Sequence, residues 1–439
     1  MVLTPPHPAL DINEVAIPAL ANFWSSFTAH FPSALSFFSP AVQSKWYATA
    51  DPLHSAVVIC AAFSTYCYVM QEITGNASQV DGLWTFLPVI YTFHFTFQRA
   101  IGHWLQPPSP VTSFFQKSAA SVSAFDLIEP RLLLIFGLQV LWSARLTFNA
   151  IRRGMFKKGE EDYRWPLLRA SMSRVAWEIF TLTFIAIAQN ILLALTAAPS
   201  YLILTATSGK FKNSPLPNPP SSLGVGDWAI AALLVLNLVI QFFADQQQWE
   251  YQNFKRGKDK YGKSLNASKD GQSSLVKPSA SKGPLAQDGT VSAAKGITSG
   301  PYTPQDAQRG FVTKGLWAFS RHPNFACEQT TWWILYLYVP LTFLPSSPAT
   351  SVLRYTATYA LISPLLMNIL FFASTIYSES VSAGKYPAYA DYQKRVGMFL
   401  PLDTAARSIY FAFIAGGETK KVVEENVWGT PTKDAVKKQ

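Results

Sequence analysis

The chain has 439 residues, of which 49% are hydrophobic and 14% are charged, whereas about 25% are charged in an ordinary soluble domain. Because this number of ionised side chains is too small to cover a water-facing surface, the composition indicates a membrane protein. It excludes a wholly disordered chain, a coiled coil and a collagen-like fibre. A net charge of +10 suggests nucleic acid in a soluble protein, but basic loops also mark the cytoplasmic side of membrane proteins, and we expect no nucleic-acid partner.

The apolar residues are concentrated in runs that suit a helical membrane protein. Residues 1–51, punctuated by proline, predict an N-terminal arm that lies partly in the membrane interface. Beyond the arm, apolar runs approach the roughly 20 residues that cross a bilayer. They cover residues 52–72, 83–98, 131–149, 175–198, 228–245, 329–344 and 352–377. These runs predict an all-α polytopic bundle with about seven spanning helices. The second run is short and a patch at 409–415 is shorter still, so six or eight crossings stay open.

The basic residues alternate between loops and orient this bundle. Lys and Arg follow the third run, fill the connection between the fifth and sixth runs, and recur after residue 385. By the positive-inside rule, this alternation predicts a cytoplasmic C-terminus.

The sequence divides into five parts. N-terminal membrane helices over 52–130 precede a membrane domain formed by residues 131–256 and 309–401. Ser, Lys, Gly, Ala and Pro dominate the intervening residues 257–308. Because such a composition buries little apolar area, it predicts a disordered cytoplasmic insertion. Residues 402–439 contain the interfacial patch at 409–415 and a tail of similar composition, which we expect to be cytoplasmic.

Polar residues stand at the ends of several runs, where their desolvation is costly and function is the usual explanation. Arg145, Asn149, Arg152 and Arg153 follow helical spacing, and the string EEDYRW at 160–165 comes next. Arginines oriented by acidic residues can bind phosphates. Snorkelling and the positive-inside bias explain them as well, and both explanations stay open.

A second polar stripe leaves the fifth run. Gln241, Asp245, Gln248, Gln252 and Lys255 recur at steps of three and four, so they share one helix face. Hydrogen bonding to a ribose or a base is about as plausible as an ordinary amphipathic helix exit.

The most informative stretch is GLWAFSRHPNFACEQ at 315–329. Pro323 suits the first turn of a helix that Ser320 could cap, and Arg321 and His322 would stand beside the positive end of its dipole. This arrangement predicts an anion site. Asn324 and Glu328 follow one turn apart, and Glu328 lies too deep for an interfacial anchor, which favours a functional role.

The last run carries Asn368, Thr375 and Glu379 on one face, followed by a Tyr- and Lys-rich segment over 385–395. An interfacial helix end explains the lysines but explains Glu379 less well. The six histidines are scattered without metal-ligand spacing, so we expect no metal. Glycine-rich nucleotide motifs and the serine-hydrolase motif are absent from the sequence.

Four strings, WSARLTFNAIRRGMF…EEDYRW, ADQQQWEYQNFK, GLWAFSRHPNFACEQ and SESVSAGKYPAYADYQKRVGMFLP, resemble the uncharacterised membrane proteins grouped with the steroid 5α-reductase C-terminal domain. The resemblance covers about residues 131–401 without the insertion. It implies a reductase of the endoplasmic reticulum that binds NADPH in its C-terminal half. Its substrate would be a lipid or sterol-like molecule with an activated C=C bond that enters from the bilayer.

The resemblance supplies no catalytic residue, and our own candidates for handling the proton are His322 and Glu328. The residues expected to bind the cofactor are Arg145, Asn149, Arg153, Asp162, Tyr163, Arg164, Asp245, Lys255, Arg321, Asn324, Glu379 and Tyr392. Two departures from the family pattern matter. Phe325-Ala326-Cys327 stands where the commoner form has Tyr-Phe-Gly, and the catalytic Glu and Tyr of steroid 5α-reductases lie in the N-terminal half, outside the resemblance.

Two alternatives stay open. One is an S-adenosylmethionine-dependent methyltransferase similar to isoprenylcysteine carboxyl methyltransferase, which has a comparable Arg-His-Pro turn and late Glu. The other is a non-catalytic lipid-binding membrane protein. NADPH carries phosphates and S-adenosylmethionine carries none, so the several arginines favour NADPH. We expect Arg321→Ala to weaken NADPH binding and to leave the fold intact.

Overall fold

The computed structural model describes residues 7–105, 123–209, 222–258, 301–343 and 355–429. The described residues form helices and no β-strand element, which confirms the all-α prediction. Five stretches are long and apolar enough to cross a membrane: Pro52–Thr74, Pro130–Arg153, Arg174–Leu195, Val225–Lys255 and Tyr359–Lys385. The chain is therefore an integral membrane protein by length and composition of its helices. It divides into unit 1, Met1–Leu236 with Thr331–Asn368, and unit 2, Asn237–Thr330 with Ile369–Gln439.

Unit 1 begins with a set of short helices that form the predicted arm. They are η1 (Pro8–Leu10), α1 (Ala16–Ala21), α2 (Phe23–His30), α3 (Ala34–Phe37) and α4 (Pro40–Thr49). Phe31 and Trp46 form a small buried core, with ring centroids 5.6 Å apart. Trp24 and Phe38 remain exposed. Exposed aromatic rings beside a small core suit a position at a membrane interface.

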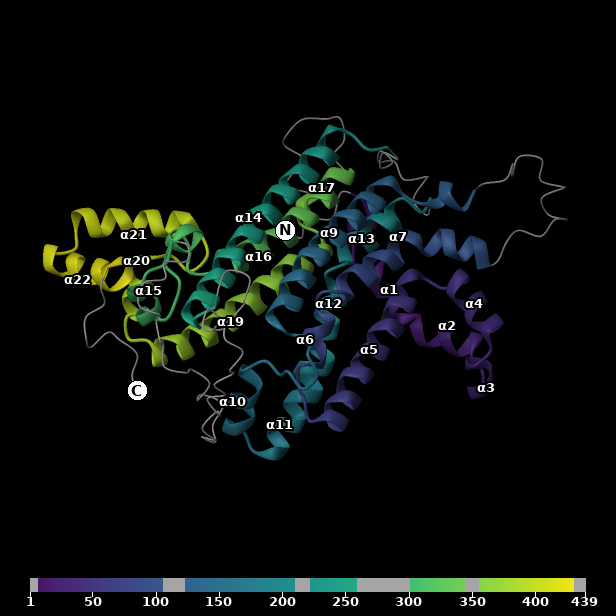
Figure 1. The fold of residues 1–439 in the computed structure, drawn as a ribbon. Helices are drawn as coiled ribbons and strands as arrows, with labels where there is room; N and C mark the ends of the chain where they lie inside the picture. The colour runs from purple at the N-terminus through teal and green to yellow at the C-terminus, as the bar shows by residue number, and fades with distance from the viewer. Residues whose placement is uncertain (1–6, 106–122, 210–221, 259–300, 344–354, 430–439) are drawn as a thin grey trace, which may run out of the picture. The chain divides into compact units, whose positions relative to one another are not determined.

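The main bundle of unit 1 consists of long helices joined by short ones. They are α5 (Pro52–Thr74), α6 (Gln79–Leu83), α7 (Leu87–Leu105), η2 (Ala124–Leu127), α9 (Pro130–Arg153), α10 (Arg164–Ser171), α11 (Arg174–Phe180), η3 (Thr181–Ala188), α12 (Gln189–Leu195), α13 (Ala198–Ala206), α17 (Tyr338–Phe343) and η6 (Tyr359–Leu361). α5 packs against α7 and η3, and α7 packs against α9 (Figure 1). Proline at the first position starts α5 and α9, where its missing N–H costs nothing.

A buried ion pair joins the first turns of α9 and α14 (Val225–Lys255). Arg131 donates to Asp227 from Nε at 2.5 Å and from Nη2 at 2.9 Å, and both side chains are almost fully buried. Thr342 accepts from Arg131 Nη1 at 3.1 Å. A bidentate pair with a further neutral partner satisfies charges that would otherwise be costly inside a bundle.

Two of the predicted runs differ from single long helices in the structure. The run at 329–344 falls on α16 (Pro323–Tyr336) and α17, with a break at Leu337. Pro340 lacks the N–H that would donate to Tyr336, and its ring crowds that carbonyl, which explains the break. The run at 83–98 becomes α7, which is not among the five apolar spans. The last run becomes α19 (Ile362–Lys385), and residues 352–354 lie outside the described residues.

Unit 2 contains α15 (Pro304–Arg309), η4 (Gly315–Ala318), α20 (Tyr389–Arg395), α21 (Pro401–Phe413) and α22 (Gly417–Trp428), together with the ends of α14, α16 and α19. α20 packs against both α21 and α22 (Figure 1). Val423 and Val427 of α22 are buried against Tyr389 and Tyr392. The polar tail therefore begins with a packed helix over residues 417–428, because two valines one turn apart dock it.

The predicted disordered insertion, residues 257–308, falls mostly outside the described part of the chain. Residues 259–300 are not described, whereas 301–308 are folded and lead into α15. Tyr302 is buried with its ring centroid 5.4 Å from that of Tyr251. Thr303 and Asp306 form a capping box, and Arg309 is buried with Nη1 2.7 Å from Asp306 Oδ1. A few anchored side chains hold a segment whose average composition is polar.

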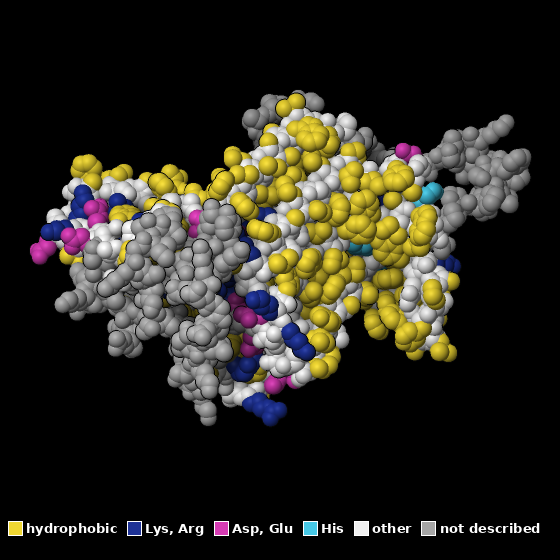
Figure 2. All heavy atoms as spheres, viewed as in Figure 1, with side chains coloured by type: hydrophobic (Ala, Val, Ile, Leu, Met, Phe, Trp, Pro, Cys, Tyr) yellow, Lys and Arg dark blue, Asp and Glu magenta, His cyan; other side chains and the backbone are white. Residues whose placement is uncertain are grey.

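The described surface carries many exposed apolar side chains. Figure 2 shows hydrophobic side chains over the helices around α9 and α5, and charged side chains of unit 1 gathered near α10. In α21, Leu402, Ile409 and Phe413 are exposed while Phe411 is buried. Such an apolar outer face is what a bilayer, rather than water, accommodates.

Candidate functional site

Unit 2 brings its polar helix ends together in two groups. The Glu379 group joins α19 to the start of α16 and to α20, and it consists of Arg321, His322, Glu379, Tyr389 and Gln393. Glu379 is buried and accepts hydrogen bonds from His322 Nε2 at 2.9 Å, Arg321 Nε at 2.7 Å and Gln393 Nε2 at 2.8 Å. Tyr389 donates to the same carboxylate at 3.3 Å. Glu379 therefore organises this group.

The local sequence sets the start of α16 as predicted. Pro323 is the first helical residue, and Ser320 Oγ accepts from the His322 backbone N–H at 3.2 Å. The backbone N–H groups of Arg321 and His322 donate to the carbonyls of Gly397 and Met398 at 2.9 and 3.1 Å. These two N–H groups are therefore used by the chain itself and do not await an anion.

The guanidinium of Arg321 is held on three sides. Beyond Nε, its Nη2 donates to Glu379 at 3.1 Å, and Nη1 donates to the carbonyls of Gln393 and Val396. The residue is 5% exposed. Because removing it would leave the Glu379 carboxylate buried without this partner, the expectation that Arg321→Ala leaves the fold intact does not match this geometry. Arg321 is a positioning residue for Glu379.

His322 is held through one of its two ring nitrogens. Glu379 holds its Nε2, and Tyr389 Oη lies 3.5 Å from the same nitrogen. Nδ1 makes no hydrogen bond to any described residue, and the side chain keeps 14% of its surface exposed. The Phe325 ring stacks on the imidazole at a centroid distance of 5.7 Å. An imidazole fixed by a carboxylate through one nitrogen can exchange a proton through the other.

The second group lies between α14 and α16 and consists of Gln241, Asp245, Asn324 and Glu328. Gln241 Nε2 donates to Glu328 at 2.7 Å and to the Asn324 carbonyl at 3.0 Å. Asn324 Nδ2 donates to Asp245 Oδ1 at 3.1 Å. Both carboxylates are buried. The four-residue step from Gln241 to Asp245 thus corresponds to two side chains of α14 that contact α16.

Two hydrogen-bond acceptors on this face of α14 are unfilled. Gln241 Oε1 and Gln248 Oε1 are buried and lack any hydrogen-bond donor among the described residues. Such an atom costs about 1–3 kcal/mol when it stays unsatisfied. It therefore suits a place where the N–H or O–H group of a ligand binds.

Lys255 stands at the end of the same stripe. Its Nζ donates to the Gly310 carbonyl at 3.0 Å and to Tyr386 Oη at 2.7 Å, and it lies 5.0 Å from the centre of the Tyr386 ring. Gly310 has φ +90°, and a Cβ there would fall 2.1 Å from the Tyr386 ring. No carboxylate of the described residues forms an ion pair with Lys255. Its charge therefore remains available to an anion.

Tyr392 supports the site from within the protein. Its hydroxyl donates to the Trp317 carbonyl at 2.5 Å, and the residue is 1% exposed. Burial raises its pKa well above the ordinary value of a phenol, so it stays protonated and keeps this bond. The structure gives Tyr392 a partner inside the chain rather than an open hydroxyl.

The remaining predicted residues belong to unit 1: Arg145, Asn149, Arg153, Asp162, Tyr163 and Arg164. Arg164 Nε pairs with Asp162 at 2.7 Å, and Arg152 Nε donates to Asn149 at 2.9 Å. Ser78 accepts from the Asp162 backbone N–H at 2.9 Å. Acidic residues do orient an arginine here, as predicted, and the segment also docks onto the turn before α6.

Sequence reasoning left Tyr389 and Gln393 out of the site, although both contact Glu379. They stand four residues apart and therefore on one face of α20, which is a pattern that the sequence does contain. Among the residues that the structure describes, no cluster of three or more His, Cys, Asp or Glu could hold a metal ion.

Comparison with protein families places the chain in a group. A family model described as "Protein of unknown function (DUF1295)" matches residues 111–396. The chain belongs to the DUF1295 family. The DUF1295 match includes both polar groups of unit 2 and the Arg145–Arg164 segment. An uncharacterised protein of Schizosaccharomyces pombe, C594.04c, is 29% identical over 356 residues, which cover 81% of each chain. No solved structure matches the chain.

Proposed function

We propose that the protein is a membrane-embedded, NADPH-dependent reductase of the endoplasmic reticulum that acts on a lipid or sterol-like substrate with an activated C=C bond. The observation that carries the proposal is His322, whose Nε2 lies 2.9 Å from a buried carboxylate oxygen while Nδ1 has no partner among the described residues. The resemblance of the site strings to the steroid 5α-reductase group supports the choice of reaction.

The residues of unit 2 fit parts of NADPH. The unfilled acceptors of Gln241 and Gln248 suit its amide and hydroxyl donors. Lys255 suits a phosphate, since its present partners are neutral oxygens. Asp245, already oriented by Asn324 at 3.1 Å, suits a ribose hydroxyl. These residues share the face of α14 that the sequence stripe predicts.

The reaction balances with one hydride and one proton. NADPH supplies the hydride when bound, and the hydride adds to the β-carbon of the enone. His322 gives a proton to the enolate that forms, at oxygen or at the α-carbon, so that the C=C bond becomes saturated. Glu379 stabilises the protonated imidazole, and Arg321 keeps Glu379 in place. A proton from solvent then restores His322.

A second candidate, an S-adenosylmethionine-dependent methyltransferase, is favoured by one observation. Arg321 and Arg164 are already paired with carboxylates, which leaves fewer open cations than the phosphates of NADPH need. S-adenosylmethionine has no phosphate and carries a positive sulfonium, which the buried carboxylates of Asp245 and Glu328 suit. A lipid-binding protein without catalysis is the third outcome.

We also propose seven crossings with a cytoplasmic C-terminus. Hydrogen bonds from Asp162 to Ser78 and from Ala77 to Glu161 hold the end of α5 beside the residues that follow α9. Because α5 and α9 therefore end on the same side of the membrane, one more crossing must lie between them. α7 supplies it, with 19 residues. Thr342 contacts Arg131 at the far end of α9, which supports a crossing by α16 and α17 together. The basic residues after α9 favour a cytoplasmic location for that side.

Ligand-induced stabilisation separates the candidates. The purified protein, in detergent, is heated with NADPH or with S-adenosylmethionine over a range of concentrations. At about 100 times its Kd, a ligand stabilises the folded protein by about 2.7 kcal/mol. An increase with NADPH alone supports the reductase. An increase with S-adenosylmethionine alone supports the methyltransferase, and no change with either supports the non-catalytic alternative.

A further inference from the structure

A polar pocket that the proposed reaction does not use lies in unit 1. Its volume is about 510 Å³, and its lining residues are Gln71, Glu72, Gly75, Arg169, Met172, Arg174, Trp177 and Glu178. Two apolar spans end beside it, since one finishes at Thr74 and another begins at Arg174. Because both spans reach their polar ends here, the pocket lies at a membrane boundary, at the depth of lipid headgroups.

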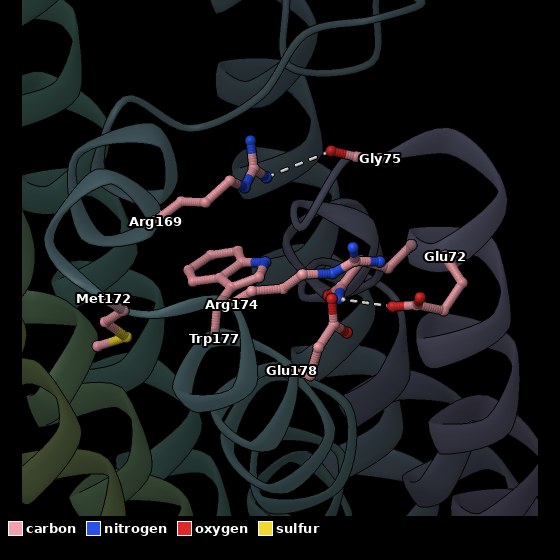
Figure 3. A pocket seen from close by; sticks show the side chains of 8 residues that line it. Glu72, Gly75, Arg169, Met172, Arg174, Trp177 and Glu178 are labelled. Atoms are coloured by element: carbon pink, nitrogen blue, oxygen red, sulfur yellow. Dashed lines mark hydrogen bonds between the residues drawn. The ribbon is translucent and has the colours of Figure 1, made fainter.

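One wall of this pocket is fixed. Arg169 Nη2 donates to Glu161 Oε1 at 2.6 Å and to the Gly75 carbonyl at 3.2 Å, and its guanidinium carbon lies 4.8 Å from the centre of the Trp177 ring (Figure 3). Trp177 is buried. The wall therefore presents a guanidinium and an indole that lose little freedom when a ligand binds.

The charged side chains on the other side form no ion pair within the described part of the chain, and Glu72 accepts one long hydrogen bond, 3.5 Å, from Gln71 Nε2. Arg174 is exposed and forms no ion pair with any described residue. Figure 3 shows it extending across the pocket toward α5, with Glu178 beside it and Glu72 on the facing helix. The lining thus holds two arginines and two glutamates, so its formal charge sums to zero.

A lining that carries both signs of charge suits a ligand that also carries both. The guanidinium of Arg174 suits a phosphate, and the carboxylates suit an ammonium group. An anionic headgroup would leave both glutamates facing negative charge. The apolar residues next to the lining are highly exposed, with Ile73 at 71%, Val175 at 69% and Ile179 at 58%. They offer a surface for acyl chains, which favours a lipid over a soluble ion.

We propose that this pocket binds the headgroup of a zwitterionic phospholipid, with its phosphodiester on Arg174 and its ammonium group beside Glu178 and Glu72. The site would hold one structural or regulatory lipid at the boundary where α5 ends and α11 begins. This proposal does not rest on the proposed reductase activity, because none of these residues belongs to the two groups of unit 2.

Native mass spectrometry tests it. The full-length protein is reconstituted in nanodiscs of equal phosphatidylcholine and phosphatidylglycerol and released for mass measurement. We expect the wild type to retain one phosphatidylcholine that Arg174→Ala/Glu178→Ala loses. The matched control, Lys158→Ala/Glu160→Ala, removes two exposed, opposite charges outside the pocket lining and should retain the lipid. Unfolding temperatures of all forms confirm that the folds are equal.

Two further arms identify the source of the phosphate. Inorganic phosphate and free phosphocholine are added to delipidated protein, and neither should be retained. Retention of either without acyl chains would overturn the assignment to a lipid. Preference for phosphatidylglycerol, or equal phosphatidylcholine in the wild type and the double variant, would overturn it as well. A single charge reversal, Arg174→Glu, should lose the lipid at least as completely as the double variant.

Discussion

Glu379 Oε1 lies 2.9 Å from His322 Nε2 and 2.7 Å from Arg321 Nε, so one carboxylate oxygen joins the imidazole to the guanidinium. This relationship gives the neighbouring residues Arg321 and His322 different roles. Arg321 fixes the carboxylate, whereas His322 is fixed by it and keeps its other nitrogen open. The two residues should therefore respond differently to substitution.

Replacing His322 should affect turnover and spare cofactor binding. In the proposed reductase, His322→Ala should lower the rate of NADPH oxidation with an enone sterol such as cholestenone by about 100- to 10,000-fold, the usual contribution of a general acid. The affinity for NADPH, measured by thermal shift, should stay within a factor of about two, since His322 touches none of the unfilled acceptors. An unchanged rate would remove His322 from the chemistry.

Replacing Arg321 should instead affect stability. Arg321→Ala leaves a buried Glu379 without its charged partner, so we expect a loss of about 3–5 kcal/mol in the free energy of unfolding. The measurement is thermal unfolding of the purified protein. Lys394→Ala is the control, because its pair with Asp391 is 62% exposed on the lysine side and should contribute less than about 1 kcal/mol. Equal unfolding temperatures for both variants would show that the buried pair is not structural.

Replacing Lys255 should weaken the binding of NADPH. Lys255→Ala removes a cation that no described carboxylate neutralises, so the Kd for NADPH should rise about tenfold or more, as expected for one charge-assisted hydrogen bond. Lys421→Ala, an exposed lysine of α22 in the same unit, gives the comparison. If both variants bind NADPH as tightly as the wild type, Lys255 does not contact a phosphate of the cofactor.

Asp306 should make the folding of residues 301–309 depend on pH. Burial raises the pKa of its carboxyl, but bonds from Lys314, Thr303 and Arg309 outweigh burial and bring the pKa below the ordinary 3.8. A depressed folded pKa stabilises the fold fully above the unfolded pKa of about 3.9 and loses that contribution as pH falls through the folded value. Proteolysis near Tyr302 should therefore increase in acid, and Asp306→Asn should remove this dependence.

The sequence predicts where helices begin and which faces are polar better than it predicts which side chains contact one another. Pro323 marks the start of α16, and the spacing from Gln241 to Lys255 marks one face of α14, because both features are local. The pair of Arg321 with Glu379 spans 58 residues of sequence, and no local pattern specifies it. For this reason Arg321 was expected to meet a phosphate, whereas it meets a carboxylate.

Average composition does not reveal the packing of two segments, for a related reason. Residues 301–308 and 417–428 are polar overall, yet Tyr302 in the first and Val423 with Val427 in the second are buried. A single docked ring, or two valines one turn apart, suffices when the rest of the core is already formed. Composition alone does not show which residue of a polar stretch finds a neighbour.

Hydride transfer to a lipid is the central claim, and isotope labelling tests it most directly. The protein is incubated with a total membrane lipid extract and with NADPH that carries deuterium at the transferable position of the nicotinamide, and the lipids are analysed by mass spectrometry. We expect a lipid that gains one deuterium and one hydrogen with the wild type and not with His322→Ala. Absence of deuterium from every lipid, in a preparation that binds NADPH, would contradict the account.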